Sequence, residues 1–331
     1  MHGNVSEMER AAPGTLPLPA AVPPIRIAWP YATIVIGYHA IALLALLPWF
    51  FSWTGVVLCI LGIYVYGGLG INLCYHRLLT HRGFVLPRWL EHTFAVIGVC
   101  CMQDTPARWV AVHRRHHQHA DEQPDPHSPL VNFFWGHMGW ILVENDELRR
   151  IGIFDRYARD VLRDSFYVWM ERTQAWVTFG VATWFIYFGL AYGAALLGGG
   201  SQMAAVQFAA SVLIWGVFVR TVAVWHITWS VNSLSHRWGY RNYETDEGSR
   251  NNWFVALITS GEGWHNNHHA DPRAASHGHR WWEWDGVFQA IRVLKFVGLA
   301  KDVALPRPHI AKLYGRSDKV RTHEYPVSPT E

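Results

Sequence analysis

The chain has 331 residues, of which 50% are hydrophobic and only 16% are charged. Soluble globular domains carry about a quarter charged residues, and disordered chains combine low hydrophobicity with high charge. The composition therefore excludes disorder over most of the chain and argues against a purely soluble protein, while a net charge of +3 is too small to indicate nucleic-acid binding.

Both ends of the chain are predicted to be tails. Residues 1–24 are rich in Pro and Ala and have an acidic start, a composition typical of a disordered N-terminal tail. A single membrane domain is expected over residues 25–305, followed by a C-terminal tail over residues 306–331.

Four apolar runs predict membrane-spanning helices, at about residues 27–51, 53–75, 173–197 and 202–225. No Lys or Arg occurs between Ile27 and His76 or between Thr173 and Val219, and each gap holds a pair of spans because one span needs about 20 apolar residues. The segment 89–102 is apolar but too short to span, and we interpret it as a re-entrant or interfacial helix. The expected fold is an all-α integral membrane protein.

The distribution of positive charge predicts the orientation. Lys and Arg favour the cytoplasmic side, and 12 of them lie in the segment 77–172 and 13 from residue 237 onward, whereas the two hairpin turns between the spans carry none. We therefore expect a multi-pass protein with both termini and the long middle segment in the cytoplasm, in the inner membrane if the protein is bacterial.

Nine of the 20 histidines fall into four short motifs, HRLLTH, HRRHH, NSLSH and HNNHH. Helix positions i, i+3 and i+4 share one face, so each HxxHH presents three imidazoles in one direction, while the HRLLTH pair is expected on neighbouring faces. Nine imidazoles exceed what one metal can hold, and two metals would take four or five each. Iron with open coordination positions binds oxygen and does redox chemistry, whereas zinc cannot change its oxidation state.

The other histidines are interpreted as ordinary surface or core residues, since a lone His is more often one of these than a ligand. They are His2, His39, His92, His119, His127, His137, His226, His277, His279, His309 and His323. Two other classes of membrane protein could also be rich in histidine, a metal transporter and a haem-binding protein. Both are less favoured than an iron-dependent redox protein, because a transporter places ionisable residues at mid-membrane and haem needs far fewer histidines.

The motifs and their order resemble the membrane fatty acid desaturases, most closely the stearoyl (Δ9) acyl desaturase branch of bacterial or cyanobacterial type. The resemblance runs from about Ile63 to Val303 and includes GINLCYHRLLTHRGF, HRRHHQHADEQPDPHSP, FWGHMGW, NSLSHRWGYRNY and GEGWHNNHH. It implies four transmembrane helices topped by a cytoplasmic helical cap that holds a di-iron centre.

The resemblance also implies the ligands. One Fe²⁺ would be held by His76, His81, His113, His117 and His268, and the other by His116, His236, His265, His269 and, through a water, Asn232. Metal-bound histidines usually give their second N–H to a carboxylate or a carbonyl. We expect Asp121, Asp125 and Glu262 to be such partners, with loop charges or helix caps as the alternative.

The resemblance places substrate residues at a bend in an acyl tunnel and at its closed end. Gln103, Trp109 and Thr228 match the bend, which would force a cis product. Tyr64 stands where the family has a bulky tunnel stopper, with Gly68 one turn further on. Ordinary helix packing is an equally good interpretation of Tyr64.

The implied reaction removes hydrogen from unactivated carbons, which no side-chain acid or base can do, so O2 and a metal must supply the oxidant. The sequence contains no fused haem or flavin motif. A separate electron donor, a ferredoxin or a cytochrome-like carrier, is therefore expected to dock on basic residues such as Arg114, Arg115 and Arg273. A membrane hydroxylase, which uses similar histidine motifs, is the nearest alternative enzyme.

The acyl carrier is expected to be a membrane lipid, and acyl-CoA is the alternative. Family members that use acyl-CoA have basic residues where this chain has Ala111 and the pair Glu144 and Asn145, and basic groups bind the anionic CoA head. Arg149 and Arg150 are candidates to compensate.

Overall fold

The computed structural model describes residues 16–149 and 151–307, and within them the chain is helical without a β-strand. The predicted tails therefore lie largely outside the described residues. Residues 16–24 lie against the body of the protein, since the Leu16 N–H donates to the Leu130 carbonyl and Val22 is buried.

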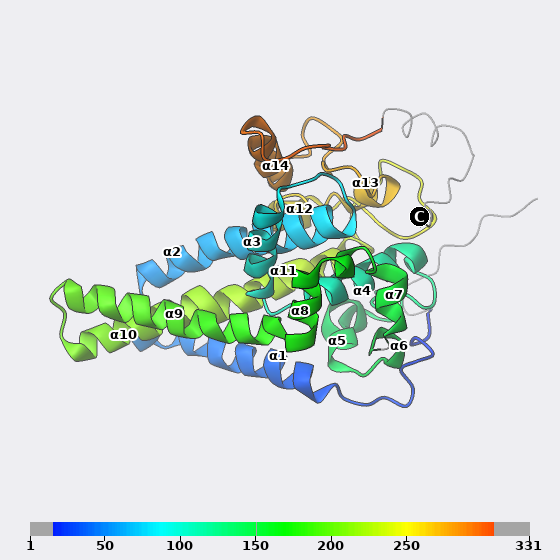
Figure 1. Ribbon diagram of the computed structural model, residues 1–331. Helices are drawn as coiled ribbons and strands as arrows, with labels where there is room; N and C mark the ends of the chain where they lie inside the picture. The colour runs from blue at the N-terminus through cyan, green and yellow to red at the C-terminus, as the bar shows by residue number, and fades with distance from the viewer. Residues whose placement is uncertain (1–15, 150, 308–331) are drawn as a thin grey trace, which may run out of the picture.

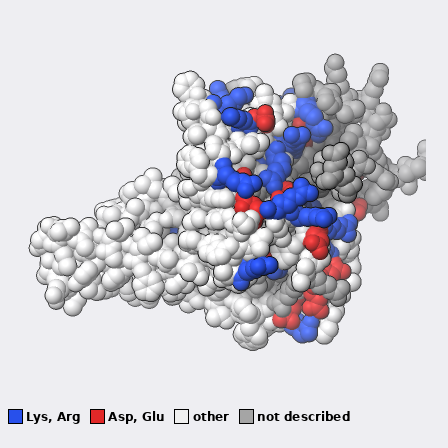
Figure 2. Space-filling model, in the orientation of Figure 1, with Lys and Arg blue, Asp and Glu red and all other residues white. Residues whose placement is uncertain are grey.

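Four helices are long and apolar enough to cross a membrane, as the apolar runs predicted. They are Trp29–Leu46, formed by α1 (Trp29–Ala42) and η1 (Leu43–Leu46); Trp53–Thr80, formed by α2 (Trp53–Gly62) and η3 (Ile63–Thr80); α9 (Ala175–Leu197); and Gln202–Leu234, formed by α10 (Gln202–Leu213), η6 (Ile214–Val219) and α11 (Arg220–Leu234). They form an elongated bundle with almost no charged side chains on its visible face (Figures 1 and 2).

The second and fourth helices extend beyond the predicted ends at residues 75 and 225, to Thr80 and Leu234. Hydropathy marks where the apolar run stops, but these helices continue because their polar ends are buried. All residues from Gly70 to Thr80 are buried, including the first histidine of HRLLTH.

Most of the remaining helices gather at one end of the bundle, and we call this group the cap (Figure 1). The cap contains α4 (Pro106–His119), η4 (Trp135–Gly139), α5 (Trp140–Leu142), α6 (Asp146–Arg149), α7 (Gly152–Tyr157), η5 (Val161–Arg163), α8 (Ser165–Thr173), α12 (Trp253–Thr259), α13 (His265–Ala270) and α14 (Gly286–Phe296). The short 3-10 helix η2 (Pro48–Phe50) lies at the opposite end, in the first hairpin turn.

The apolar segment 89–102 forms α3 (Arg88–Val99), which crosses the bundle near the cap instead of running along it (Figure 1). It packs against η3 at a very close approach: a Cβ added to Gly70 would lie 2.6 Å from the Cα of Gly98. Two glycines therefore let the backbones of α3 and η3 touch.

Candidate metal centre and cavity

The HRLLTH motif lies on the π-helical end of η3. A π-helix bonds residue i to i+5, and the His81 N–H donates to the His76 carbonyl at 3.1 Å. The wider turn brings both side chains to one side, with ring centroids 4.8 Å apart. The five-residue spacing thus places two imidazoles together, where an α-helix would have placed them on neighbouring faces.

The HRRHH motif lies on α4, which begins at Pro106 with the Thr105 hydroxyl accepting from the Arg108 N–H at 3.4 Å. Pro in the first turn and Thr at the N-cap are typical helix starts. The helix passes between two groups of histidines. His113 and His117 face one group and His116 faces the other.

The HNNHH motif forms α13, a helix of only six residues, and its two asparagines anchor it. The side-chain carbonyl of Asn251 accepts from the backbone N–H groups of Asn266 and Asn267 at 3.0 and 3.2 Å. Asn267 also donates to Glu283 at 2.7 Å. These bonds fix the helix so that its three histidines face α4 and η3.

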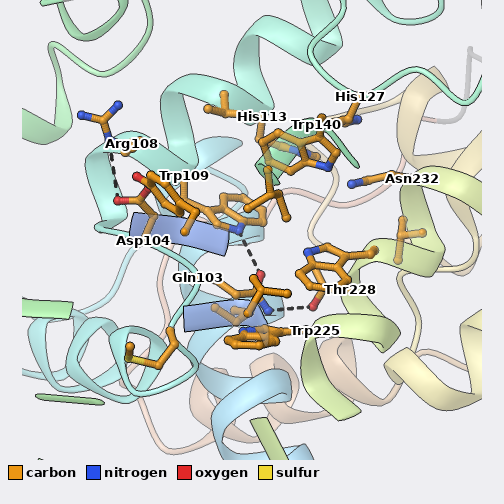
Figure 3. Close-up of a pocket in the computed structure, with 18 of the residues that line it drawn as sticks. Gln103, Asp104, Arg108, Trp109, His113, His127, Trp140, Trp225, Thr228 and Asn232 are labelled. Carbon is orange, nitrogen blue, oxygen red and sulfur yellow. Dashed lines mark hydrogen bonds and ion pairs between the residues drawn. The ribbon is translucent and has the colours of Figure 1, made fainter. Parts of the chain in front are cut away.

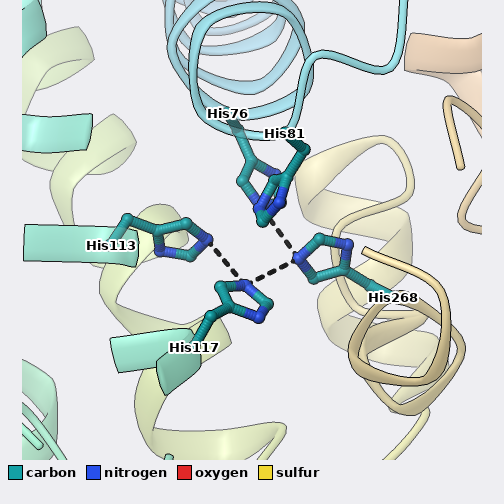
Figure 4. A group of neighbouring side chains, drawn as sticks. All are labelled: His76, His81, His113, His117 and His268. Atoms are coloured by element: carbon teal, nitrogen blue, oxygen red, sulfur yellow. Dashed lines mark hydrogen bonds between the residues drawn. The ribbon is translucent and has the colours of Figure 1, made fainter. Parts of the chain in front are cut away.

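All nine histidines of the motifs are buried, at most 9% exposed, and they form two clusters. Cluster 1 is His76, His81, His113, His117 and His268 (Figure 4). Cluster 2 is His116, His236, His265 and His269. Within each cluster one ligand atom from every ring lies within 4.8 Å of the others. This grouping coincides with the division of histidines that the resemblance implied.

The ring nitrogens within each cluster converge on one point. The Nε2 atom of His268 lies 3.1 Å from that of His76 and 3.0 Å from that of His117. In cluster 2, Nε2 of His265 lies 3.0 Å from that of His236 and 3.1 Å from that of His269. A single ring N–H cannot serve two such neighbours well, so hydrogen bonding alone leaves these atoms poorly satisfied.

The same distances fit a shared metal ion. Metal–imidazole bonds of about 2.0–2.1 Å place two ligand nitrogens about 2.8–3.0 Å apart when they subtend a right angle, and about 3.3–3.4 Å apart in a tetrahedron. The observed 3.0–3.1 Å lies between these values and fits nitrogens that share one metal ion. Both nitrogens of His81 and Nε2 of His116 are buried without a hydrogen-bond partner among the described residues, so each ring has a nitrogen available to a metal.

Three carboxylates bind the outward nitrogens of the clusters. Nδ1 of His76 lies 2.6 Å from Glu262, Nδ1 of His116 lies 3.0 Å from Asp125, and Nδ1 of His236 lies 2.8 Å from Asp121. A proton on Nδ1 leaves the Nε2 lone pair directed into the cluster. The three acidic residues singled out from the sequence therefore lie where they can orient ligands.

Burial and the neighbouring imidazoles hold the pKa of several histidines well below its ordinary value, which keeps them neutral and able to bind a metal. These residues are His113, His117, His265, His268 and His269. Burial also lowers the pKa of His236, but the Asp121 carboxylate outweighs it and raises the pKa to about 9. Asp121 thus favours a positive charge at this ring.

Two histidines classed as ordinary lie against the clusters. The ring of His277 is 4.3 Å from that of His268, and its Nδ1 is 3.2 Å from Glu262. The ring of His127 is 4.4 Å from that of His116. Neither residue belongs to a helical HxxHH motif, so spacing could not reveal them; the presence of His127 in the desaturase-like segment QPDPHSP was the one available signal.

Three other ordinary histidines form a chain on the side of the bundle. Nε2 of His39 lies 3.0 Å from Nε2 of His226, whose Nδ1 lies 2.9 Å from Nε2 of His137. His137 in turn lies 2.9 Å from the Ser233 hydroxyl. His226 uses its two nitrogens in opposite directions, so the chain links helices and does not surround one point.

A cavity of about 170 Å³ extends from the clusters between the helices of the bundle (Figure 3). Its wall includes His76 and His113 of cluster 1 and His265 of cluster 2. Most of the remaining wall is apolar, with four tryptophans besides Trp109: Trp140, Trp176, Trp225 and Trp229. An elongated apolar guest in this cavity would lie directly against both groups of imidazoles.

Gln103, Trp109, Thr228 and Asn232 all line this cavity. The Gln103 amide donates to the Thr228 hydroxyl at 3.1 Å, and its carbonyl accepts from the Trp109 indole at 3.4 Å (Figure 3). Tyr64 and Gly68 do not line it. They line a second cavity of about 10 Å³ that shares Asn72 and Thr228 with the first.

The structure contradicts the expectation that Arg114 and Arg115 present a docking surface. Each is only 8% exposed, because Arg114 binds Asp160 and three backbone carbonyls and Arg115 binds Glu147. Arg273 is exposed as expected. The side chain of Arg149 and all of Arg150 lie outside the described residues.

Ala111 is fully buried, and Glu144 forms an ion pair with Arg26 at 3.2 Å. Asn145 lines the cavity. None of the three residues that replace the basic residues of acyl-CoA enzymes therefore places a positive charge at the cavity.

Comparison with known proteins gives the same assignment over most of the chain. The fatty acid desaturase family model matches residues 49–292. An sn-1 stearoyl-lipid 9-desaturase of Synechocystis is 41% identical over 86% of this chain and 82% of its own length. An sn-2 palmitoyl-lipid 9-desaturase of Nostoc is 40% identical over 82% of this chain and 88% of its own length.

An acyl-CoA C20 Δ5-desaturase of the plant Anemone leveillei is 39% identical over 82% of this chain and 80% of its own length. The similarity thus extends to relatives named for different carriers and different double-bond positions. What they share with this chain is the family. On this evidence the chain belongs to the fatty acid desaturase family.

Proposed function

We propose that the protein is an O2-dependent desaturase that inserts a cis Δ9 double bond into a long saturated acyl chain carried by a membrane glycerolipid. The observation that carries this proposal is the apolar cavity whose wall includes imidazoles of both histidine clusters. The names of the similar cyanobacterial enzymes support the position and the carrier.

The donor set fits two ferrous ions, which the nine histidines of the clusters would hold, and Asn232 would contribute to one of them through a water. The chemistry that such ions supply is the activation of O2 and the removal of one hydrogen from each of two adjacent carbons. Burial keeps several of these imidazoles neutral and so supports metal binding, and a redox reaction calls for iron because zinc cannot change its oxidation state.

The chain's own contribution is to place the reacting carbons. The bonds among Gln103, Thr228 and Trp109 hold three wall residues in fixed positions. A guest bent around them presents two neighbouring carbons to the imidazole end, and the tryptophan walls exclude water from it. We infer that this bend determines both the position and the cis geometry of the double bond.

The charges at the cavity support a lipid carrier. Among the described lining residues the one Lys or Arg is Arg108, and it lies 3.6 Å from Asp104 and 3.3 Å from Glu171. A CoA head group carries several phosphates, which need basic groups of their own. A glycerolipid does not carry the CoA head group and so does not need these basic groups.

Electrons would come from a separate protein. We further infer that the cap and both termini face the cytoplasm, since Lys and Arg are concentrated outside the spans. In this orientation a soluble carrier can reach the cap.

The test is expression in a bacterial host that lacks a Δ9 desaturase, with gas chromatography and mass spectrometry to locate the double bond. We expect a new cis-Δ9 monoene from the wild type, none from His116→Ala, and an undiminished yield from His119→Ala, a matched change on the same helix outside both clusters. A hydroxylated product would contradict desaturation. Label that appears first in acyl-CoA, during a short acetate pulse, would contradict the lipid carrier.

A further inference from the structure

A short stretch of the cap connects the protein surface to cluster 1. This stretch, residues 152–163, comprises α7 and η5, and we call it the α7–η5 segment. It contacts three residues that each adjoin a histidine of cluster 1 in the sequence. These residues are Arg82, Arg114 and Gln118, which follow His81, His113 and His117.

Asp160 joins the exposed part of this connection to the buried part. Its Oδ2 atom accepts from Arg82 at 2.7 Å, and its Oδ1 atom accepts from Arg114 at 2.6 Å. Arg114 also donates to the backbone carbonyls of Leu79 and Thr80 at the end of η3, at 2.8 and 2.9 Å. Hydrogen bonds and a few covalent bonds therefore lead from the surface to His81 and His113.

The second connection runs through Gln118. Its side-chain oxygen accepts from the Tyr157 hydroxyl at 2.6 Å and from Arg156 at 3.1 Å. Gln118 directly follows His117 of cluster 1 in the chain. The ring of His117 also stacks on that of His269 in cluster 2, with centroids 4.4 Å apart. The α7–η5 segment thus contacts the immediate sequence neighbours of three cluster 1 histidines, and electron transfer between redox centres requires a short distance.

The outer face of this segment is basic. Arg156, Arg159 and Arg163 of the segment and the adjoining Arg82 are all exposed, and they outnumber the two exposed carboxylates of the segment, Asp155 and Asp160. Within the described residues no carboxylate pairs with Arg159 or Arg163. Figure 2 shows a band of Lys and Arg side chains across this side of the cap, with fewer Asp and Glu among them. A surface of this kind attracts an acidic partner and speeds its association.

We propose that the four arginines Arg82, Arg156, Arg159 and Arg163 form the docking surface for an acidic one-electron carrier protein. The inference rests on the proposed function, which requires such a donor. Per double bond, the saturated CH2–CH2 pair, O2, two electrons and two protons become CH=CH and two waters. Two carriers are oxidised, each giving one electron, and the two protons come from solvent.

The position of the patch favours a protein partner over lipid head groups. Arg172 lies close before α9, and Arg88 precedes the exposed Trp89, so these two cations are suited to the membrane surface. Arg159 and Arg163 are separated from α9 by the whole of α8. We therefore exclude Arg88 and Arg172 from the docking surface.

The experiment uses the iron-loaded protein in nanodiscs of neutral lipid and an acidic plant-type [2Fe–2S] ferredoxin as the probe. The test variant is the double change Arg159→Glu with Arg163→Glu. The matched control is Arg292→Glu with Lys295→Glu, which makes the same change of charge on exposed positions of α14. Arg82 is left intact because it also holds Asp160.

Two quantities are measured: binding of oxidised ferredoxin by calorimetry, and desaturation driven either by reduced ferredoxin or by reduced methyl viologen, which needs no docking. We expect the test variant to bind ferredoxin roughly tenfold more weakly, with a smaller dependence on salt, while the control variant binds like the wild type. Desaturation driven by viologen should be equal in all three proteins.

Ferredoxin binding that is equal in the test variant and the wild type would overturn the proposal. So would a loss that appears only in nanodiscs of anionic lipid, since that would assign the patch to lipid head groups. A fall in viologen-driven desaturation would mean that the double change to Glu damages the enzyme itself. In that case ferredoxin binding by the milder variant, Arg159→Gln with Arg163→Gln, decides whether the patch is the docking surface. A wild type that forms no double bond with viologen would refute the proposed function and leave the binding result intact.

Discussion

Glu262 binds His76 of cluster 1 through one carboxylate oxygen, which lies 2.6 Å from the ring Nδ1. Its other oxygen accepts from Arg77 at 2.8 and 3.0 Å. The carboxylate thus holds two consecutive residues of η3 from the segment that leads into α13. It ties the HRLLTH motif to the HNNHH motif and fixes the direction of the His76 ring.

Replacing this carboxylate should weaken metal binding. In Glu262→Gln the uncharged amide supports a bound cation less well and disturbs the buried Arg77. Changes of this kind cost about 10–100-fold in metal affinity. We expect a rise of that size in the free Fe²⁺ concentration needed to half-fill the protein, measured by elemental analysis after dialysis against buffered iron. Glu244→Gln, at an exposed position, is the control, and equal iron affinity in both variants would refute the role of Glu262.

The contact between α3 and η3 should tolerate no side chain at Gly70. The added Cβ of Gly70→Ala would lie 2.6 Å from the Cα and N atoms of Gly98, and backbone atoms cannot move aside cheaply. Overpacking of this kind costs about 1–3 kcal/mol. We expect a lower midpoint of thermal unfolding in detergent. Gly37→Ala, in the middle of α1 with nothing within 4 Å, should leave the midpoint unchanged or raise it.

The number of membrane-length helices could be predicted because hydropathy is a local property of the sequence. The nine clustered histidines could be predicted because their spacing is also local. The π-helical turn of η3 was not, since it depends on burial of the polar end of the helix among cap residues. The contact of His277 with Glu262 was also missed, because the chain between them folds back in a way that no helical spacing marks. The burial of Arg114 was missed for a related reason, because a basic residue looks alike in sequence whether it is exposed or paired.

Asp160 should make the fold of the cap sensitive to acid. Burial raises the pKa of this carboxyl, but Arg114 and Arg82 outweigh it and hold the pKa at about 2, below the ordinary value of about 3.9. A depressed pKa stabilises the fold above about pH 4, and this contribution is lost as the pH falls toward 2.

The matched test compares wild type with Asp160→Asn by thermal unfolding in detergent. The variant should be less stable at pH 7, and the difference should shrink as the pH is lowered from about 5 to 3. Asp155→Asn, at an exposed position of α7, should match the wild type throughout. A difference that stays constant across this range would show that the ion pairs of Asp160 contribute nothing that depends on its charge.

Tyr64 is predicted to limit the length of the acyl chain, although it does not line the main cavity. It lines the small second cavity, which meets the first at Asn72 and Thr228. If the end of the acyl chain passes Thr228, Tyr64→Ala removes the ring that closes its path. Because one methylene in an apolar pocket changes selectivity by about 10–200-fold, we expect roughly tenfold more product from chains longer than stearoyl, measured by mixed-substrate competition. Val65→Ala, the adjacent residue outside both cavities, is the control. An unchanged product profile would leave Tyr64 as a helix-packing residue, partly exposed on the bundle, and would place the end of the chain inside the main cavity.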